Sequence, residues 1–283
     1  MSVLGIISET CQVVMPRLWP LTALDRQLAK SVGDGPALPP IFIVGPPRTG
    51  TTILYQRLLT HFRFTYPSNV DAALFSLPCM AHAISRSFKD RERSHGDSSD
   101  FGYVPGLWGA SEAGPLMRYF LDDERRVTSF GQAVRHMSAA SGLPYLCKNT
   151  VNAVRLPTIF EALPDAWVVR THRDRETTAR SILKMRRSVG SEQDWAGVRP
   201  DGSESVSAAA PIEQTRWQYD AVQSQIDRDL AAAGRTAFDV QYEEFIADPP
   251  AMLQGLASAY ANDTGIVVGQ SGIPIPDMMK KPG

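Results

Sequence analysis

The sequence predicts an α/β fold of three layers, in which helices cover both faces of a mainly parallel central sheet. Short apolar runs with the length of buried strands alternate with longer amphipathic segments along the chain. The first apolar run, residues 41–44, is followed at once by a glycine-containing turn and a helical pattern. Strands that alternate with helices in this way pair in parallel and are joined by right-handed crossovers.

Five segments have the apolar or alternating pattern of strands. Residues 41–44 are all apolar, which suits an inner strand, whereas residues 62–66 alternate and end at Pro67. The expected strands cover residues 41–44, 62–66, 143–148, 166–170 and 236–241.

Eight segments carry the apolar spacing of helices. Their ends coincide with residues that start or stop helices: Gly33 ends the first, Ser68 or Asn69 caps the third, and Pro164 stops the fifth. The expected helices cover residues 21–32, 53–59, 71–86, 130–140, 151–163, 177–187, 212–233 and 250–261.

The pattern divides the chain into a main domain and two ends. The main domain is expected at residues 39–265, with an N-terminal extension at 1–38 and a C-terminal tail at 266–283. Two polar, glycine-containing segments, 87–110 and 188–211, interrupt the main domain. Long segments of this kind are often functional, and we expect them to act as lids over a substrate.

The composition is that of an ordinary globular enzyme, with 43% hydrophobic and 21% charged residues. The formal net charge of −1 argues against binding of nucleic acid or of a membrane surface through bulk charge, so any anion site is local. We see neither a signal peptide nor a run of about 20 apolar residues. We therefore expect no membrane span and a cytoplasmic protein.

Three cysteines, Cys11, Cys79 and Cys147, lie far apart in the sequence. Their spacing matches neither a metal site nor a disulfide framework. Each has apolar neighbours, which indicates buried free thiols, and no metal site is expected.

The turn after the first strand has the frame of a phosphate-binding loop: Gly45, four residues, Gly50 and two further positions. A turn between strand and helix places free backbone N–H groups at a positive helix end, which suits an anion. Thr51 stands where nucleoside triphosphatases have a lysine, and Arg48 lies inside the loop. This favours one tetrahedral anion, held without a metal, over a triphosphate on Mg²⁺.

The same loop resembles the 5′-phosphosulfate loop of sulfotransferases, which use 3′-phosphoadenosine 5′-phosphosulfate (PAPS). The resemblance implies a P-loop-like sulfotransferase fold for the main domain. It also implies a set of residues that bind the 5′-phosphate. These are Pro47, Arg48, Thr49, Gly50, Thr51 and Thr52.

Lys148 ends a short apolar strand, and the carboxyl ends of parallel strands are where such sheets bind ligands. The run Lys148-Asn149-Thr150 resembles the Lys-x-Pro of sulfotransferases, with Thr150 in place of the proline. The resemblance implies that Lys148, together with Arg48, neutralises charge that grows on the transferred group and its leaving oxygen. The alternative is a surface lysine that closes a strand.

Arg173 and Ser181 lie eight residues apart, across the end of a strand and the first part of a helix. They resemble the arginine and serine with which sulfotransferases bind the 3′-phosphate, although Arg175 replaces the proline usual in that family. A guanidinium and a hydroxyl are suitable partners for a phosphate. The alternative is a solvated basic helix.

Three residues are candidates for the base that takes the acceptor proton. Glu112 is preferred, and Asp71 and His82 are the others. Each also has a plain structural interpretation: Glu112 in the first turn of a helix capped by Ser111, Asp71 as a first-turn charge, and His82 as a core or solvated histidine. Geometry has to decide between them.

The resemblance implies in-line transfer of the sulfuryl group of PAPS to a hydroxyl or amine of a small-molecule, carbohydrate or lipid acceptor. The product of the donor is adenosine 3′,5′-bisphosphate (PAP). Two alternatives remain open from the sequence. One is a nucleotide or small-molecule kinase of the P-loop type, and the other is a non-catalytic nucleotide-binding protein with the same fold.

Overall fold

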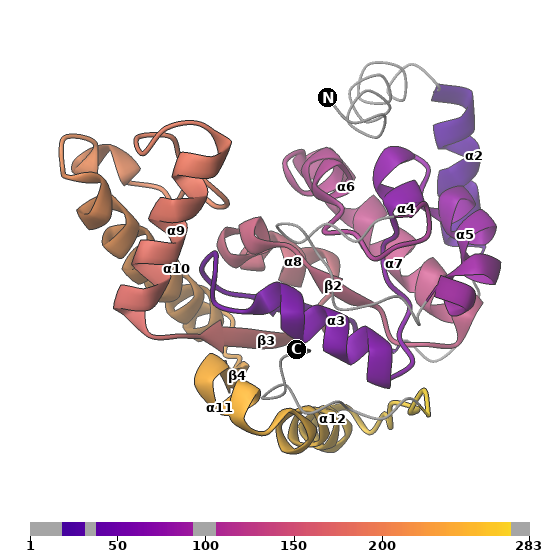
Figure 1. The fold of residues 1–283 in the computed structure, drawn as a ribbon. Coiled ribbons are helices and arrows are strands. Elements are labelled where there is room, and N and C mark those ends of the chain that lie inside the picture. Colours follow the sequence, from indigo (N-terminus) through magenta and orange to yellow (C-terminus); the bar gives the residue numbers. More distant parts are fainter. Residues whose placement is uncertain (1–18, 32–37, 93–105, 273–283) are drawn as a thin grey trace.

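A computed structural model describes residues 19–31, 38–92 and 106–272 (Figure 1). Its centre is a four-stranded sheet in which every pairing is parallel and the strand order is β2-β1-β3-β4. The strands are β1 Ile41–Val44, β2 Leu146–Lys148, β3 Trp167–His172 and β4 Phe238–Gln241. The expectation of an α/β fold with a parallel sheet is confirmed.

Strand β1 shows why the fold has three layers. All four of its side chains are fully buried, and they alternate between two hydrophobic clusters. Ile41 and Ile43 pack with residues of α3 (Thr51–His61) and α12 (Pro249–Thr264). Phe42 and Val44 pack on the opposite face, with residues of α7 (Glu124–Ser141) and α8 (Leu156–Ala162). The sheet therefore lies between two layers of helices (Figure 1).

The remaining helices include α9 and α10 on one side of the domain and α2 and α5 on the opposite side (Figure 1). They are α2 Trp19–Lys30, α4 Asn69–Ala73, α5 Pro78–Glu92, α6 Gly114–Leu121, α9 Arg175–Val189, α10 Pro211–Ala232 and α11 Tyr242–Ala247, with 3₁₀ helices η2 Thr150–Val154 and η3 Ser203–Val206.

The expected strand at residues 62–66 is wrong. This segment makes only isolated bridges, from Phe62 to Gln270 and from Thr65 to Tyr145. Alternating side chains satisfy the pattern of a strand, but a strand also needs a neighbour along its length. Here the chain touches the edge of the sheet at Thr65 and then turns into α4.

Two expected helices are divided. The helix expected at 71–86 is broken into α4 and α5, with Pro78 as the first residue of α5. The helix expected at 151–163 is broken into η2 and α8, with Pro157 in the first turn of α8. Proline has no N–H to donate, so it is tolerated in a first turn and not in a helix interior.

The two segments expected to be lids, 87–110 and 188–211, are partly helical in their described parts. Residues 87–92 belong to α5 and not to a loop, and residues 93–105 lie outside the described part of the chain. The segment at 188–211 begins with the last residues of α9 and contains η3. Its Trp195 ring packs edge-on against Trp217 of α10, with ring centroids 6.0 Å apart. The expected extension at 1–38 and tail at 266–283 are described only in part.

Cys79 and Cys147 are buried free thiols, as expected, and burial raises the pKa of Cys147 to about 12. Cys11 lies outside the described residues. Within the described ranges, no three His, Cys, Asp or Glu residues are grouped so that they could hold a metal ion. No described helix is both long and apolar enough to cross a membrane.

Helix α7 approaches the end of α8 so closely that Gly131 has no room for a side chain. A Cβ at this position would lie 2.2 Å from the carbonyl oxygen of Ala162. Alanine normally favours a helix over glycine by about 1 kcal/mol, but backbone overlap costs more. We expect Gly131→Ala to lower the free energy of unfolding by about 1–3 kcal/mol, measured by denaturant titration.

Gly255 of α12 is the matched control, because an added Cβ there meets nothing within 4 Å. Gly255→Ala is expected to leave the stability unchanged or raise it by up to about 1 kcal/mol. Equal stabilities of the two variants would contradict the close contact between α7 and α8.

Candidate active site

The phosphate loop joins β1 to α3 and depends on two glycines. A Cβ on Gly45 would lie 2.3 Å from the Thr171 hydroxyl oxygen at the end of β3. Gly50 has φ +90° and caps α3, and a Cβ there would lie 2.4 Å from the ring of Tyr242. The loop is therefore pressed against both β3 and α11, and the N–H groups of the first turn of α3 have no partners within that helix.

Thr49 holds the loop from inside. Its hydroxyl donates to the carbonyl oxygen of Pro46 at 2.7 Å and lies 2.6 Å from the Thr171 hydroxyl. Thr49 is buried, so its side chain belongs to the structure of the loop. Of the groups on Thr49, only the backbone N–H fits the expected role in anion binding. Thr171 was not among the predicted site residues, although it follows the apolar core of a predicted strand.

Arg48 points the other way. It has φ +70°, an uncommon conformation for a residue with a side chain, and it is exposed. Its Nε donates to the Ser181 hydroxyl at 3.1 Å, and Nη1 of Arg173 donates to the Arg48 carbonyl oxygen at 3.2 Å. The structure thus brings together three residues that the sequence placed in two separate phosphate sites.

Tyr242 connects the two parts of this site. The Arg173 guanidinium lies over the Tyr242 ring, 4.3 Å from its centroid, and the same ring contacts Gly50. The hydroxyl of Tyr219 fixes the backbone of Arg173 by donating to its carbonyl oxygen at 2.9 Å. Tyr242 was not among the predicted site residues, although it directly follows a predicted strand, where parallel sheets bind ligands.

Lys148 lies at the opposite side of the α3 N-terminus from Arg173. Its side chain is only 3% exposed, and Nζ donates to the Thr52 hydroxyl at 3.0 Å. Nζ also forms an ion pair with the Glu112 carboxylate, whose side chain is 31% exposed. A buried ammonium needs such partners, because burying an unpaired charge is costly. The side-chain N–H of Asn149 donates to the backbone carbonyl oxygen of Glu112 at 2.9 Å and so holds this residue in place.

The plain structural interpretation of Glu112, in the first turn of a helix capped by Ser111, does not hold. Helix α6 begins at Gly114 with Ala113 as its N-cap, and Ser111 instead accepts a hydrogen bond from the Ala113 N–H at 3.1 Å. Glu112 therefore precedes the helix and reaches Lys148.

The other candidate bases are enclosed. Asp71 is fully buried and forms a capping box with Ser68, whose N–H donates to the carboxylate at 2.6 Å. This confirms Ser68 as the cap and gives Asp71 a structural role. His82 is 1% exposed within α5. Glu112 is the one candidate of the three that is both partly exposed and in contact with Lys148.

Comparison with known proteins decides the family. The sequence profile described as "Sulfotransferase family" matches residues 39–260, which is most of the chain. The chain belongs to the sulfotransferase family. This is a family of enzymes that use PAPS, and its match supports the fold and the enzyme class expected from the phosphate loop. No curated protein sequence matches the chain.

Solved structures of sulfotransferases share the fold. Sulfotransferase STF9 from Mycobacterium avium is 16% identical with a TM-score of 0.54, and the match covers 85% of this chain and 68% of that one. Sulfotransferase STF1 from Mycobacterium tuberculosis H37Rv is 18% identical with a TM-score of 0.51, with 87% of this chain and 73% of that one covered. At such identities the likeness supports the fold and not the acceptor.

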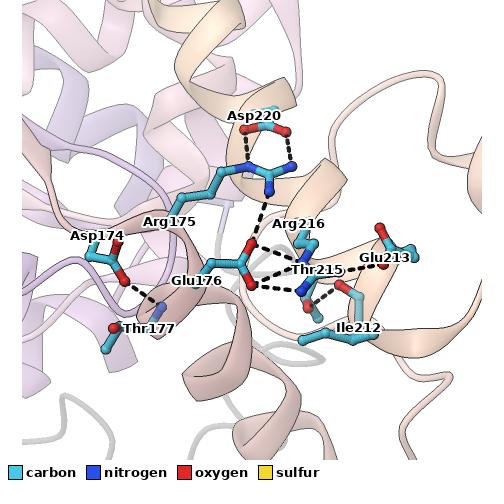
Figure 2. A network of polar contacts seen from close by, with 9 residues as sticks. All are labelled: Asp174, Arg175, Glu176, Thr177, Ile212, Glu213, Thr215, Arg216 and Asp220. Atoms are coloured by element: carbon cyan, nitrogen blue, oxygen red, sulfur yellow. Dashed lines mark hydrogen bonds and ion pairs between the residues drawn. The ribbon is translucent and has the colours of Figure 1, made fainter.

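In this sulfotransferase, the turn that carries Arg173 is tied to α10 by a polar network (Figure 2). Asp174 caps α9 by accepting from the Thr177 N–H at 2.8 Å. Arg175 forms a two-point contact with Asp220 of α10, at 2.8 and 2.5 Å. Glu176 accepts from Arg216 of α10 at 2.6 Å. These contacts place the start of α9, and with it Arg173 and Ser181, beside the phosphate loop.

The network has a predictable pH dependence, because hydrogen bonds from Arg216 hold the pKa of Glu176 below its ordinary value. A carboxylate with a lowered pKa stabilises the fold above the ordinary pKa of about 4. This contribution is lost as the pH falls through the lowered pKa. At pH 7 we expect Glu176→Gln to lower the melting temperature by about 1–3 °C.

Melting of wild type and variant at pH 7, 5 and 3 tests this, with the exposed Glu161 of α8 as control. The difference between Glu176→Gln and wild type should shrink toward pH 3, and Glu161→Gln should match wild type throughout. A difference that grows toward acid pH would contradict the assignment.

Proposed function

We propose that the protein transfers the sulfuryl group of PAPS in-line to a hydroxyl or amine of a small-molecule, carbohydrate or lipid acceptor. One observation carries the proposal. Arg48 of the phosphate loop is hydrogen-bonded to Ser181 and, through its carbonyl oxygen, to Arg173. Arg173 and Ser181, which suit a 3′-phosphate, are thus adjacent to the phosphate loop, which suits a 5′-phosphate.

The residues fit a nucleotide with phosphates at both the 5′ and the 3′ position of its ribose. The N–H groups from Thr49 to Thr52 and the positive end of α3 would hold the 5′-phosphate. Arg173 and Ser181 would hold the 3′-phosphate, with Arg48 and Pro47 between the two sites. Contacts with the 3′-phosphate supply binding energy remote from the reaction and discriminate against ATP, which lacks that group.

The residues around Lys148 fit the chemical step. PAPS supplies a sulfuryl group bonded to a phosphate oxygen, which is the leaving atom. Glu112 would accept the proton of the acceptor while the acceptor oxygen or nitrogen bonds to sulfur and the bond between sulfur and the phosphate oxygen breaks. The released electron pair stays on the phosphate oxygen of PAP, where Lys148 supplies compensating charge. The Glu112 side chain, the proposed proton acceptor, contacts Lys148 directly, so the two groups of the chemical step are adjacent.

The kinase alternative has less support. A kinase of the P-loop type needs a lysine at the position of Thr51 to reach the β- and γ-phosphates. The lysine of this site comes instead from β2, and it is bonded to Thr52 and Glu112. The family match also favours sulfuryl transfer.

Calorimetric titration with PAP, with ATP and Mg²⁺, and with 5′-AMP tests the proposal. We expect PAP to bind far more tightly than the other two. In Arg173→Ala we expect PAP binding to weaken by about 1–3 kcal/mol, the value of a charge-assisted hydrogen bond. The control is Lys184→Ala, which removes an exposed cation from α9, the helix that carries Ser181. Preference for ATP with Mg²⁺, or unchanged PAP affinity in Arg173→Ala, would contradict the proposal.

Lys148→Ala separates binding from chemistry. We expect its PAP affinity to stay within about tenfold of wild type, because Lys148 acts chiefly on charge that develops in the transition state. Transfer should be nearly abolished. The measurement is release of PAP from PAPS in the presence of a panel of phenols, alcohols and amines. Wild-type turnover by Lys148→Ala would refute its catalytic role.

A further inference from the structure

Arg186, near the end of α9, is the largest of the fully buried side chains, with an exposed fraction of 0%. In the described part of the chain, its hydrogen bonds go to neutral oxygens. Nη1 donates to the side-chain oxygen of Gln214 at 2.9 Å and to the carbonyl oxygen of Glu192 at 3.3 Å, and Nη2 donates to Gln218 at 3.1 Å. Burial lowers the pKa of the guanidinium. Burying a charge among neutral partners costs free energy, which the contacts of Arg186 have to offset.

These contacts hold the segment 192–199, which follows α9. Trp195 lies against the Arg186 guanidinium, with 4.5 Å from the guanidinium carbon to the ring centroid. Gln218 accepts from Arg186 and donates its own N–H groups to the carbonyl oxygens of Ala196 and Val198, at 3.0 and 2.5 Å. The backbone of the segment is thus fastened to α10 through a side chain that Arg186 orients.

The held segment touches the phosphate loop. Gly197 has φ +76°, and a Cβ there would lie 2.6 Å from Cγ of Pro47. The same Cβ would lie 3.9 Å from the hydroxyl of Thr150, two residues after Lys148. Gly197 therefore lies between the loop that carries Arg48 and the segment that follows Lys148.

We propose that Arg186 is a positioning residue that fixes the segment 192–199 as a rigid wall of the donor site, against Pro47. The segment then forms a fixed wall and does not act as a moving lid. Its effect on donor binding rests on the proposed function. Only a guanidinium supplies enough donors in one plane to bond two glutamines on successive turns of α10 and a carbonyl oxygen.

The first test compares Arg186→Met with Arg187→Met. Arg187 is the neighbouring, exposed residue and pairs with the Glu192 carboxylate. Arg187→Met therefore removes a surface ion pair and leaves the buried contacts of Arg186 in place. Hydrogen exchange of the backbone N–H groups at 192–199 and calorimetric titration with PAP are measured for both. In Arg186→Met we expect exchange in the segment to be at least tenfold faster and the PAP Kd to rise about tenfold at full binding stoichiometry.

A merely structural role of Arg186 would give a different result. Partial unfolding lowers the stoichiometry of PAP binding and leaves the Kd of the folded fraction unchanged. In turnover, a positioning role raises the KM for PAPS and spares kcat, whereas partial unfolding lowers the apparent kcat. The proposal is overturned if exchange at 192–199 is unchanged, or if the segment loosens while the Kd stays that of wild type.

The second test acts from the other side of the contact and keeps Arg186. Gly197→Ala places a Cβ against Pro47, whereas the control Gly202→Ala carries similar strain at φ +81° with its nearest contact at 3.9 Å, to Trp217. We expect Gly197→Ala to weaken PAP binding about tenfold and Gly202→Ala to leave it unchanged. Wild-type affinity in Gly197→Ala would overturn the proposal even if Arg186→Met fails to fold.

The two proposals can fail separately. If wild-type protein does not bind PAP, the proposed function fails, and with it the role of the wall at a donor site. Hydrogen exchange still shows whether Arg186 fixes the segment. If wild type binds PAP and the Arg186→Met and Gly197→Ala variants bind it equally well, the proposal of a rigid wall is overturned and the proposed function stands.

Discussion

Positive charge gathered around the N-terminus of α3 is the constraint on which the rest of this structure depends. Arg48, Arg173 and Lys148 surround a helix end that is itself positive. In the described part of the chain, Arg48 bonds to a hydroxyl, Arg173 stacks on an aromatic ring, and only Lys148 pairs with a carboxylate. Neutral partners orient a cation without cancelling its charge, so the site remains suited to an anion with charge at two separated points.

In the proposed mechanism, Glu112 has two roles. Without a donor it is the counter-ion that permits Lys148 to be buried at 3% exposure. With a donor in place, anionic oxygens of the transferred group would share Lys148, and the carboxylate would face the acceptor. The ion pair therefore places the proposed base and the proposed electrostatic stabiliser side by side before either substrate binds. This is preorganisation, and it is more effective than groups that must be gathered during the reaction.

The sequence predicted what is local and missed what depends on distant partners. The β1–loop–α3 unit follows from adjacent residues, and so does the capping box of Ser68. The prediction of a strand at 62–66 was wrong because a strand needs a neighbouring strand, which the alternation of apolar and polar residues does not reveal. The contact of Tyr242 with Arg173 joins residues far apart in the chain. Arg186 was not predicted to be buried, since nothing in the local sequence distinguishes a buried arginine from an exposed one.

Helices α9 and α10 form the frame of the proposed donor site, and they are attached to each other at two points that differ in physical character. At the start of α9, Arg175 and Glu176 bond to α10 through partly exposed ion pairs, which water and salt weaken. Near its end, Arg186 bonds to Gln214 and Gln218 in a buried site, where hydrogen bonds are strong and unpaired groups are costly. Ser181 lies about one and a half turns from either attachment. The Ser181 hydroxyl is therefore positioned by a frame whose buried end is shielded from salt, which suits the phosphate contact proposed for this residue.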